Sequence, residues 1–313
     1  MIEPLYAAWD CEESDDPDCD ARRLKYDNYI RECENQSKQV SRDGASIGTY
    51  AIRCDYAERK NERPRLQKPN EDFQLRNEEQ GFFILADGVT RPHSEYRNPE
   101  LCNLAAECAR ELCQSIQNCF LQNTREETNP IERMTEALSA GNRCVKEFRK
   151  KKWEDQVSDL SVSYPPCCTL LLAYFTENTM FFYNCCDTIG FLIRNGVKMQ
   201  FTDHYNWRAE IEGIPKQTVY QELHNNPNHE AGFAIVNGDD RFDQFIRIGQ
   251  LQIQSGDRVI LSSDGLAEFL SATSGDVLQK LTAKEMVRKS KAFDQAPFRK
   301  YADDKSCIII DVL

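Results

Sequence analysis

The sequence predicts an α+β protein in which two packed antiparallel β-sheets (a β-sandwich) are flanked by helices, in αββα layers. Short apolar runs of strand length are joined by brief links such as Asn195-Gly196, and strands joined this closely pair antiparallel. Two amphipathic helical stretches occur together and do not alternate with strands, which argues against a parallel βαβ arrangement. Apolar residues make up 40% of the 313, enough for a large core.

The expected domain begins at residue 46. Residues 1–45 are acidic and show little periodic apolar content, so we expect a loosely packed N-terminal extension before one domain over residues 46–313. A short strand is expected over Ser46–Arg53 and a polar, proline-containing loop over Asp55–Pro69. The apolar run Phe82–Ala86 predicts a buried strand that ends at an Asp-Gly turn.

Two helices are expected next. Each is predicted to begin at an Asn-Pro pair, Asn98-Pro99 and Asn129-Pro130, because asparagine caps a helix and proline suits its first position. Apolar residues recur at helical spacing after both pairs. The chain has 14 cysteines but no C-x-x-C pair. We interpret them mainly as small buried hydrophobic residues, because disulfide scaffolds are short and secreted.

Most of the strands are predicted in the second half of the chain, with short connections. They are Cys168–Phe175, Met180–Cys186, Ile189–Arg194, Lys198–Thr202, Gly232–Val236, Arg258–Ser263 and Ser306–Val312. A helix near Val277–Ala292 is expected before the last strand.

Charge and hydropathy argue against several classes of protein. The net charge is −12, from 39 basic and 51 acidic residues. The basic runs are short, and the run Arg149–Lys152 suits the end of a predicted helix, so we expect no nucleic-acid partner. No apolar run approaches the roughly 18 residues that span a membrane, and the start lacks a signal-peptide pattern. We therefore expect a cytoplasmic protein with no membrane partner; the oligomeric state is not predicted.

Acidic residues stand at the ends of the predicted core strands. Asp87 follows FFILA, Asp264 follows VILSS, and Asp303 precedes SCIIIDV, while Glu71-Asp72 follows the predicted loop. Any single Asp-Gly pair is best explained as ordinary turn chemistry. Several carboxylates crowded together repel one another unless cations neutralise them, and Mg²⁺ and Mn²⁺ prefer such oxygen ligands. The pattern therefore indicates a carboxylate site for a hard cation.

Five motifs make this interpretation sharper. They are NEDF (Asn70–Phe73), ILADGV (Ile84–Val89), CDTIGFLIRNG (Cys186–Gly196), LSSDGLAEFL (Leu261–Leu270) and ADDKSCIII (Ala302–Ile310). In this order the series resembles the metal-dependent protein phosphatase family of the 2C type, in its bacterial-type variant. The resemblance runs from about residue 46 to the C-terminus and implies a β-sandwich flanked by helices.

The resemblance implies a centre of two Mg²⁺ or Mn²⁺ ions. Asp87 would bridge both ions, and Gly88 would offer its carbonyl oxygen to one of them. Asp264 and Asp303 would bind the other ion, with Glu71 holding it through water. On this basis Asp87 and Asp264 would be the catalytic aspartates.

The resemblance also covers supporting residues and includes three departures. Asp187 matches the aspartate of the family's GDSR motif, and Asp72 would be a supporting acid beside the metal ligands. Gln67 stands where the family has an arginine that grips the substrate phosphate, so Lys68 or Arg65 would have to compensate, although lysine lacks arginine's planar fork. Val89 replaces the histidine of the DGH form, and CDTIG has no arginine.

We therefore expect a protein-serine/threonine phosphatase that hydrolyses the phosphate monoesters of a phosphoprotein with a hydroxide activated between two cations. Two alternatives stay open. One is a pseudophosphatase that binds a phosphoprotein or partner without turnover; Gln67 favours it and the intact acids oppose it. The other is a small-molecule phosphatase of the same fold. The sequence identifies neither the physiological substrate nor the metal used in the cell.

Overall fold

The computed structural model describes residues 51–60, 68–91, 95–98, 100–122, 129–155, 164–202, 213–215, 218–229, 231–294 and 303–313. The predicted extension over residues 1–45 lies outside these ranges, so the proposed domain boundary stays a prediction. Gln67 also lies outside them.

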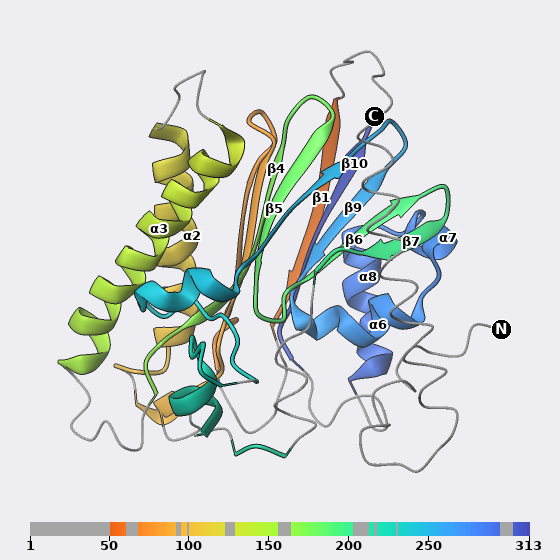
Figure 1. Cartoon of the computed structure of the whole chain (residues 1–313). Coiled ribbons are helices and arrows are strands. Elements are labelled where there is room, and N and C mark those ends of the chain that lie inside the picture. Colours follow the sequence, from red (N-terminus) through yellow and green to blue (C-terminus); the bar gives the residue numbers. More distant parts are fainter. Residues whose placement is uncertain are drawn as a thin grey trace, which may run out of the picture.

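Two antiparallel sheets of five strands each form the centre of the molecule (Figure 1). The first sheet has the order β1 (Ile52–Arg59), β10 (Lys305–Val312), β9 (Arg258–Ser262), β6 (Ile189–Arg194) and β7 (Val197–Gln200). The second sheet has the order β2 (Asp72–Asn77), β3 (Phe82–Gly88), β4 (Cys168–Phe175), β5 (Thr179–Cys185) and β8 (Arg247–Gln252).

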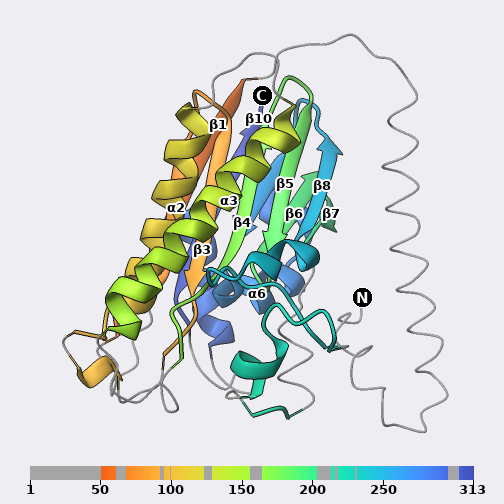
Figure 2. The same ribbon diagram turned by 60° about the vertical axis from the view of Figure 1, so that its left-hand side comes forward.

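Helices cover the outer face of each sheet (Figure 1, Figure 2). On the second sheet lie α2 (Leu104–Gln122) and α3 (Pro130–Arg149), and beside the first sheet lie α6 (Ala267–Ala272), α7 (Gly275–Leu278) and α8 (Ala283–Lys289). Single turns of 3-10 or π-helix occur at Glu95–Arg97, Lys150–Glu154, Val219–Leu223, Asp240–Phe245, Asp264–Leu266 and Ser290–Phe293. The predicted α+β fold with αββα layers is confirmed.

The apolar run of β3 is explained by burial on both faces. Phe82, Ile84 and Ala86 pack toward α2 and α3, whereas Phe83 and Leu85 pack between the sheets. A strand covered on both faces has no need of polar residues at alternate positions, so its sequence is continuously apolar. Strand β10 is built in the same way, with one side between the sheets and the other toward α8.

The two long helices begin differently. Helix α3 begins as predicted, with the Asn129 side chain accepting a hydrogen bond from the backbone N–H of Ile131 at 2.9 Å. Helix α2 begins at Leu104, later than predicted. Asn98 instead opens a turn, in which its side chain accepts a hydrogen bond from the backbone of Glu100.

The missed strands are edge strands. Neither β2 nor β8, the two edges of the second sheet, was predicted, and β1 extends to Arg59 through residues predicted as loop. Edge strands are partly exposed and carry polar residues, so they lack the apolar run that marks β3. The predicted strand Gly232–Val236 is wrong, because Phe233 and Val236 form only isolated bridges.

The helix predicted over Val277–Ala292 is divided in the structure. Helix α7 ends at Leu278, and α8 begins after Thr282. The hydroxyl of Thr282 accepts a hydrogen bond from the Glu285 backbone, and the Glu285 carboxylate bonds back to the Thr282 backbone. This capping box fixes a new helix start, and the T-A-K-E sequence carries the signal for it.

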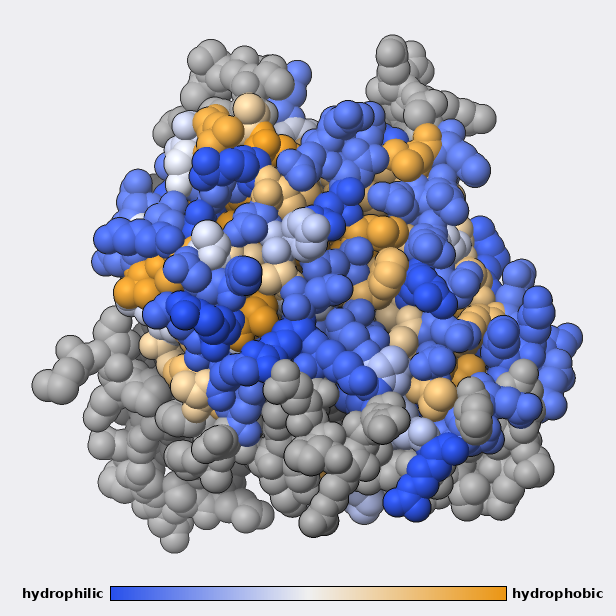
Figure 3. All heavy atoms as spheres, turned by 180° about the vertical axis from the view of Figure 1, so that it is seen from behind, coloured by the Kyte–Doolittle hydropathy of each residue, from blue (hydrophilic) through white to orange (hydrophobic). Residues whose placement is uncertain are grey.

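The described cysteines are all free thiols, and most are buried, including Cys108, Cys113 and Cys168. The interpretation of these residues as small hydrophobes is confirmed. Seen from behind, apolar side chains are scattered among hydrophilic ones (Figure 3). Among the described helices, none combines the length and apolar character that crossing a membrane requires.

Gly88 ties the end of β3 to helix α2. A Cβ atom at this position would lie 2.5 Å from the carbonyl oxygen of Ala105, far inside van der Waals contact. Glycine is therefore required here, because the helix backbone comes so close. The same contact fixes the position of the preceding residue, Asp87, relative to α2.

We expect Gly88→Ala to lower the free energy of unfolding by about 1–3 kcal/mol, because the opposing group is backbone and cannot rotate away. The urea midpoint without added metal measures this loss. Gly256→Ala is the control: nothing lies within 4 Å of its Cβ, so only the left-handed backbone at φ +89° is strained. An unchanged urea midpoint for Gly88→Ala would contradict the close-approach explanation.

Candidate active site

The strand ends that lie next to acidic residues in both sheets gather at one end of the sandwich, the lower end in Figure 1. Asp72 is the first residue of β2, and Asp87 is the last residue but one of β3. Asp187 lies in the connection from β5 to β6, Asp264 follows β9, and Asp303 precedes β10. Five segments that are far apart in the sequence therefore deliver carboxylates to the same end.

Hydrogen bonds between the two sheets fix this arrangement. The backbone N–H of Glu71 donates to Oδ2 of Asp304 at 2.9 Å, across 233 residues of chain. The hydroxyl of Ser263 donates to Oδ2 of Asp72 at 2.7 Å. Asp72 is also the cross-strand partner of Asp87. The acids on the second sheet are thus positioned by groups on the first.

The crowding of charge is strongest around Asp87. Burial raises its pKa well above the usual range. Nearby negative charges raise it further, and these belong to Asp72, Asp264, Asp303 and Asp187. The pKa of Asp72 is also raised well above its usual value, first by burial and then by the charge of Asp304.

The connection that carries Asp187 is held in an uncommon backbone conformation. Cys186 has φ +69°, in the left-handed region that residues other than glycine rarely adopt. The buried Asn184 amide braces the loop by donating to the backbone carbonyl of Thr188 at 3.0 Å and to its hydroxyl at 3.1 Å. Such strain persists only where surrounding contacts enforce it, and here it holds Asp187 close enough for its charge to raise the pKa of Asp87.

Lys68 lies among acids and is only 2% exposed. Its ammonium nitrogen is 2.5 Å from Oε2 of Glu71, 3.1 Å from Asp304 and 3.7 Å from Asp303. Burial alone would lower the pKa of Lys68, but these three carboxylates raise it above its usual value, so the side chain is a fixed positive charge. The expected contact of Lys68 with a substrate phosphate stays a prediction.

The donor set can be compared with what a hard cation requires. Oδ1 of Asp72 is buried and accepts no hydrogen bond from the described residues. The neighbouring carboxylates repel one another, and their oxygens are the kind of ligand that Mg²⁺ or Mn²⁺ prefers. In the described part of the chain, no three His, Cys, Asp or Glu side chains form a ready-made ligand set. The aspartates around Asp87 would therefore need to rotate to bind a cation.

The carboxylate of Glu71 is less suited to its predicted role of holding a metal ion through water. Lys68 and the Thr90 hydroxyl, at 3.0 Å, both donate to Oε2. The Tyr96 hydroxyl donates to Oε1. Both oxygens are thus already bonded to protein groups. Neither Thr90 nor Tyr96 belongs to one of the five sequence motifs, so the sequence did not predict these contacts.

The helical turn Val219–Leu223 contacts Thr90, which follows the end of β3. The hydroxyl of Tyr220 donates to the Thr90 carbonyl at 3.2 Å. Val219 and Tyr220 pack with Val89 on a small apolar cluster that contains Leu223 and Phe233. Val89 therefore serves as a packing residue beside the site.

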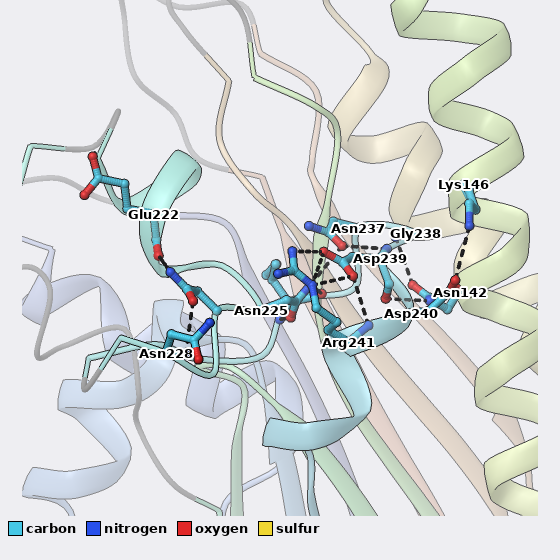
Figure 4. Close-up of polar contacts among 12 residues, drawn as sticks. Asn142, Lys146, Glu222, Asn225, Asn228, Asn237, Gly238, Asp239, Asp240 and Arg241 are labelled. Atoms are coloured by element: carbon cyan, nitrogen blue, oxygen red, sulfur yellow. Dashed lines mark hydrogen bonds and ion pairs between the residues drawn. The ribbon is translucent and has the colours of Figure 1, made fainter.

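Buried asparagines fasten this segment to the body of the protein (Figure 4). Asn225, at φ +50°, donates to the Ile235 carbonyl and to the Asn237 side chain, both at 2.9 Å. Asn142 of α3 accepts a hydrogen bond from Gly238 at 2.9 Å. Asn225 thus closes the segment on itself, and Asn142 attaches its Gly238 end to α3.

Comparison with solved structures identifies the fold. The Mycobacterium tuberculosis serine/threonine phosphatase PstP/Ppp is similar over 83% of this chain and 98% of its own, with TM-score 0.57 and 18% identity. The PstP catalytic domain in complex with two manganese ions is similar over 85% and 100%, with TM-score 0.57 and 17% identity. PppA of Pseudomonas aeruginosa is similar over 86% and 100%, with TM-score 0.58 and 17% identity.

No protein-family model matches the sequence, and no curated protein matches it. The structural likeness shows that the chain has the fold of these serine/threonine phosphatases, as the five motifs predicted. Identity at this level does not assign catalytic residues, so the roles of the individual acids stay predictions.

Asp264→Asn tests whether the acids repel one another without a cation. We expect the metal-free variant to melt at least as high as the wild type, because one negative charge has been removed from the group around Asp87. Mn²⁺ at about 100 times its Kd should stabilise the wild type by about 2.7 kcal/mol and the variant much less. Thermal melts with Mn²⁺ or chelator measure both effects.

The matched control is Asp240→Asn, whose side chain is 82% exposed and pairs with Lys146 of α3. It should melt like the wild type under both conditions. A metal-free Asp264→Asn protein that melts well below wild type would show that Asp264 has a structural role.

The pH dependence of stability tests whether His224, which follows this helical turn, is buried. Burial lowers its pKa to about 3, from 6.5 in the unfolded chain. Between these values the unfolded state binds a proton that the folded state excludes, so stability falls as the pH falls through this window. His224→Phe should reduce the loss between pH 7 and pH 5 by about 2 kcal/mol. Urea unfolding at both pH values measures it, and an unchanged loss would mean that His224 is solvated.

Proposed function

We propose that the chain is a metal-dependent phosphatase that hydrolyses phosphoserine and phosphothreonine esters in proteins. The observation that supports it most is the group of carboxylates around Asp87, brought from both sheets to one end of a phosphatase fold. Buried acids at this density raise the free energy of the metal-free protein, so a binding role accounts for them better than a structural one.

A divalent cation, when bound, lowers the pKa of a bound water and neutralises charge on the phosphoryl oxygens. The chain's own residues then have positioning roles. Asp87, Asp264 and Asp303 would supply oxygen ligands, and Ser263 orients Asp72 by its hydroxyl. Because these groups lie in or next to the ends of strands of both sheets, their backbones are held in place before any substrate arrives, and only the side chains have to rotate.

The choice of a phosphoprotein as substrate follows from the structural relatives, which are serine/threonine phosphatases. A small-molecule phosphatase of the same fold remains the second candidate for the substrate class. No contact among the described residues selects a metabolite.

The pseudophosphatase alternative depends on the missing phosphate-gripping arginine at position 67. Arg91 does not replace it, because its guanidinium is buried and donates to Oε2 of Glu95 at 2.8 Å. Weak substrate binding is therefore expected. The grouped acids still favour turnover, since a protein without metal chemistry gains nothing from their repulsion.

Turnover with Mn²⁺ decides between these alternatives. We expect the full chain to hydrolyse p-nitrophenyl phosphate and a phosphothreonine peptide with Mn²⁺, and to stop when chelator is added. Asp87→Asn should lower kcat by at least about 10²-fold, because an electrostatic contact to the transition state is lost. Asp240→Asn should keep full activity.

Three outcomes are informative. Binding of a phosphopeptide by folded, Mn²⁺-loaded protein without turnover would favour the pseudophosphatase. Faster hydrolysis of phosphorylated metabolites than of phosphopeptides would favour a small-molecule phosphatase. Chelator-resistant hydrolysis would contradict the metal-dependent mechanism.

A further inference from the structure

A second buried lysine, Lys305, is the first residue of β10, and its side chain is only 3% exposed. It lies on the face of β10 that packs toward the helices, because Cys307 and Ile309 share that face and pack with α8. The ammonium group donates to the carbonyl oxygen of Gly265 at 2.8 Å and to Oδ1 of Asp294. A lysine is rarely buried to this extent unless its charge is paired.

The Gly265 carbonyl belongs to the 3-10 turn Asp264–Leu266, which carries one of the predicted metal ligands. The same glycine lies against the backbone of Asp304. A Cβ atom at position 265 would clash with the Asp304 carbonyl oxygen and lie 3.1 Å from Cγ of Lys305. The turn is therefore held from two sides by the segment that begins with Asp303, another predicted ligand.

Strand pairing alone does not reach this turn. The last paired residues of β9 and β10 are Ser262 and Cys307. One further hydrogen bond joins the backbone N–H of Ser263 to the carbonyl of Ser306 at 3.1 Å. The side chain of Lys305 continues the link between the two strands beyond that point, as far as the turn that carries the aspartate.

The charge of Lys305 is compensated by Asp294, which follows the 3-10 turn Ser290–Phe293 at the end of α8. The side chain of Asp294 is 19% exposed, so its carboxylate keeps contact with water. Its backbone N–H donates to the Lys291 carbonyl at 3.2 Å, which fixes the counter-charge on the helical layer. The buried ammonium group therefore has a charged partner on one side and the Gly265 carbonyl on the other.

We propose that Lys305 is a positioning residue for metal binding. Through the Gly265 carbonyl it holds the turn of Asp264 at the distance from Asp303 that a shared divalent cation requires. The inference rests on the proposed function, in which these two aspartates bind the same ion. Without the lysine the turn can move relative to β10, and ordering the two ligands then opposes metal binding.

The affinity for Mn²⁺ tests the proposal without any activity measurement. Electron paramagnetic resonance of free Mn²⁺ gives the Kd, at a temperature where circular dichroism shows each protein to be folded. Lys305→Met keeps the apolar stem and removes the donor to Gly265. We expect its Kd to rise about 10–100-fold, as is typical when a group that orients a metal ligand is lost. A folded Lys305→Met protein with the wild-type Kd would overturn the proposal.

The matched control is Lys198→Met, at the other end of α6. Lys198 is partly buried and donates to the backbone carbonyls of Leu270, Ser271 and Thr273 at 2.6, 2.7 and 2.9 Å. We expect its loss to lower stability and to leave the Kd for Mn²⁺ unchanged, because these carbonyls lie at the end of the helix. An equal rise of the Kd in both variants would overturn the specific role of Lys305.

The double variant Lys305→Met/Asp294→Asn covers the case in which Lys305→Met does not fold. It removes both charges of the pair, which costs less stability than leaving one charge without its partner. The Gly265 carbonyl still lacks its donor, so we expect the same weak Mn²⁺ binding. A folded double variant that binds Mn²⁺ as tightly as the wild type would overturn the proposal.

These measurements also separate the inference from the proposed function. A wild-type chain that binds no Mn²⁺ would overturn both. Unchanged Mn²⁺ binding by Lys305→Met, in a protein that hydrolyses phosphopeptides, would overturn only the positioning role. Weak binding by Lys305→Met, with no turnover by the Mn²⁺-loaded wild type, would support the positioning role and overturn the phosphatase.

Discussion

The repulsion among buried carboxylates is the constraint on which this structure depends. Asp87 and Asp72 are buried beside further acids, and burial together with neighbouring negative charge raises their pKa values. A fold tolerates such a group only if cations or hydrogen-bond donors compensate it. Ser263 and the backbone of Glu71 supply donors, and Lys68 supplies one internal positive charge.

The sandwich concentrates these acids because its strands end together. Strand β3 is covered on both faces, so its last residues are held rigidly between α2 and the first sheet. The close contact of Gly88 with α2 fixes the position of Asp87 relative to that helix. Strands β9 and β10, paired antiparallel, place Asp264 and Asp303 at the same end. Strand ends and the short segments next to them therefore determine the geometry of the site.

Much of this was predictable from the sequence. Strands buried on both faces leave a continuous apolar run, as β3 and β4 do, and Asn129 carries a helix-start signal that the structure confirms. Edge strands β2 and β8 leave no such pattern and were missed. The grouping of Asp87 with Asp264 and Asp303 followed from motif order. The burial of Lys68 did not, because it depends on Asp304, which joins the site only through tertiary folding.

The central claim is that the acids around Asp87 bind a divalent cation. Crystals grown with Mn²⁺ and measured at a wavelength where manganese scatters anomalously would test it most directly. The account predicts anomalous scattering within coordination distance of the carboxylates of Asp87 and Asp264. No peak at these aspartates, with Mn²⁺ in excess, would contradict the account.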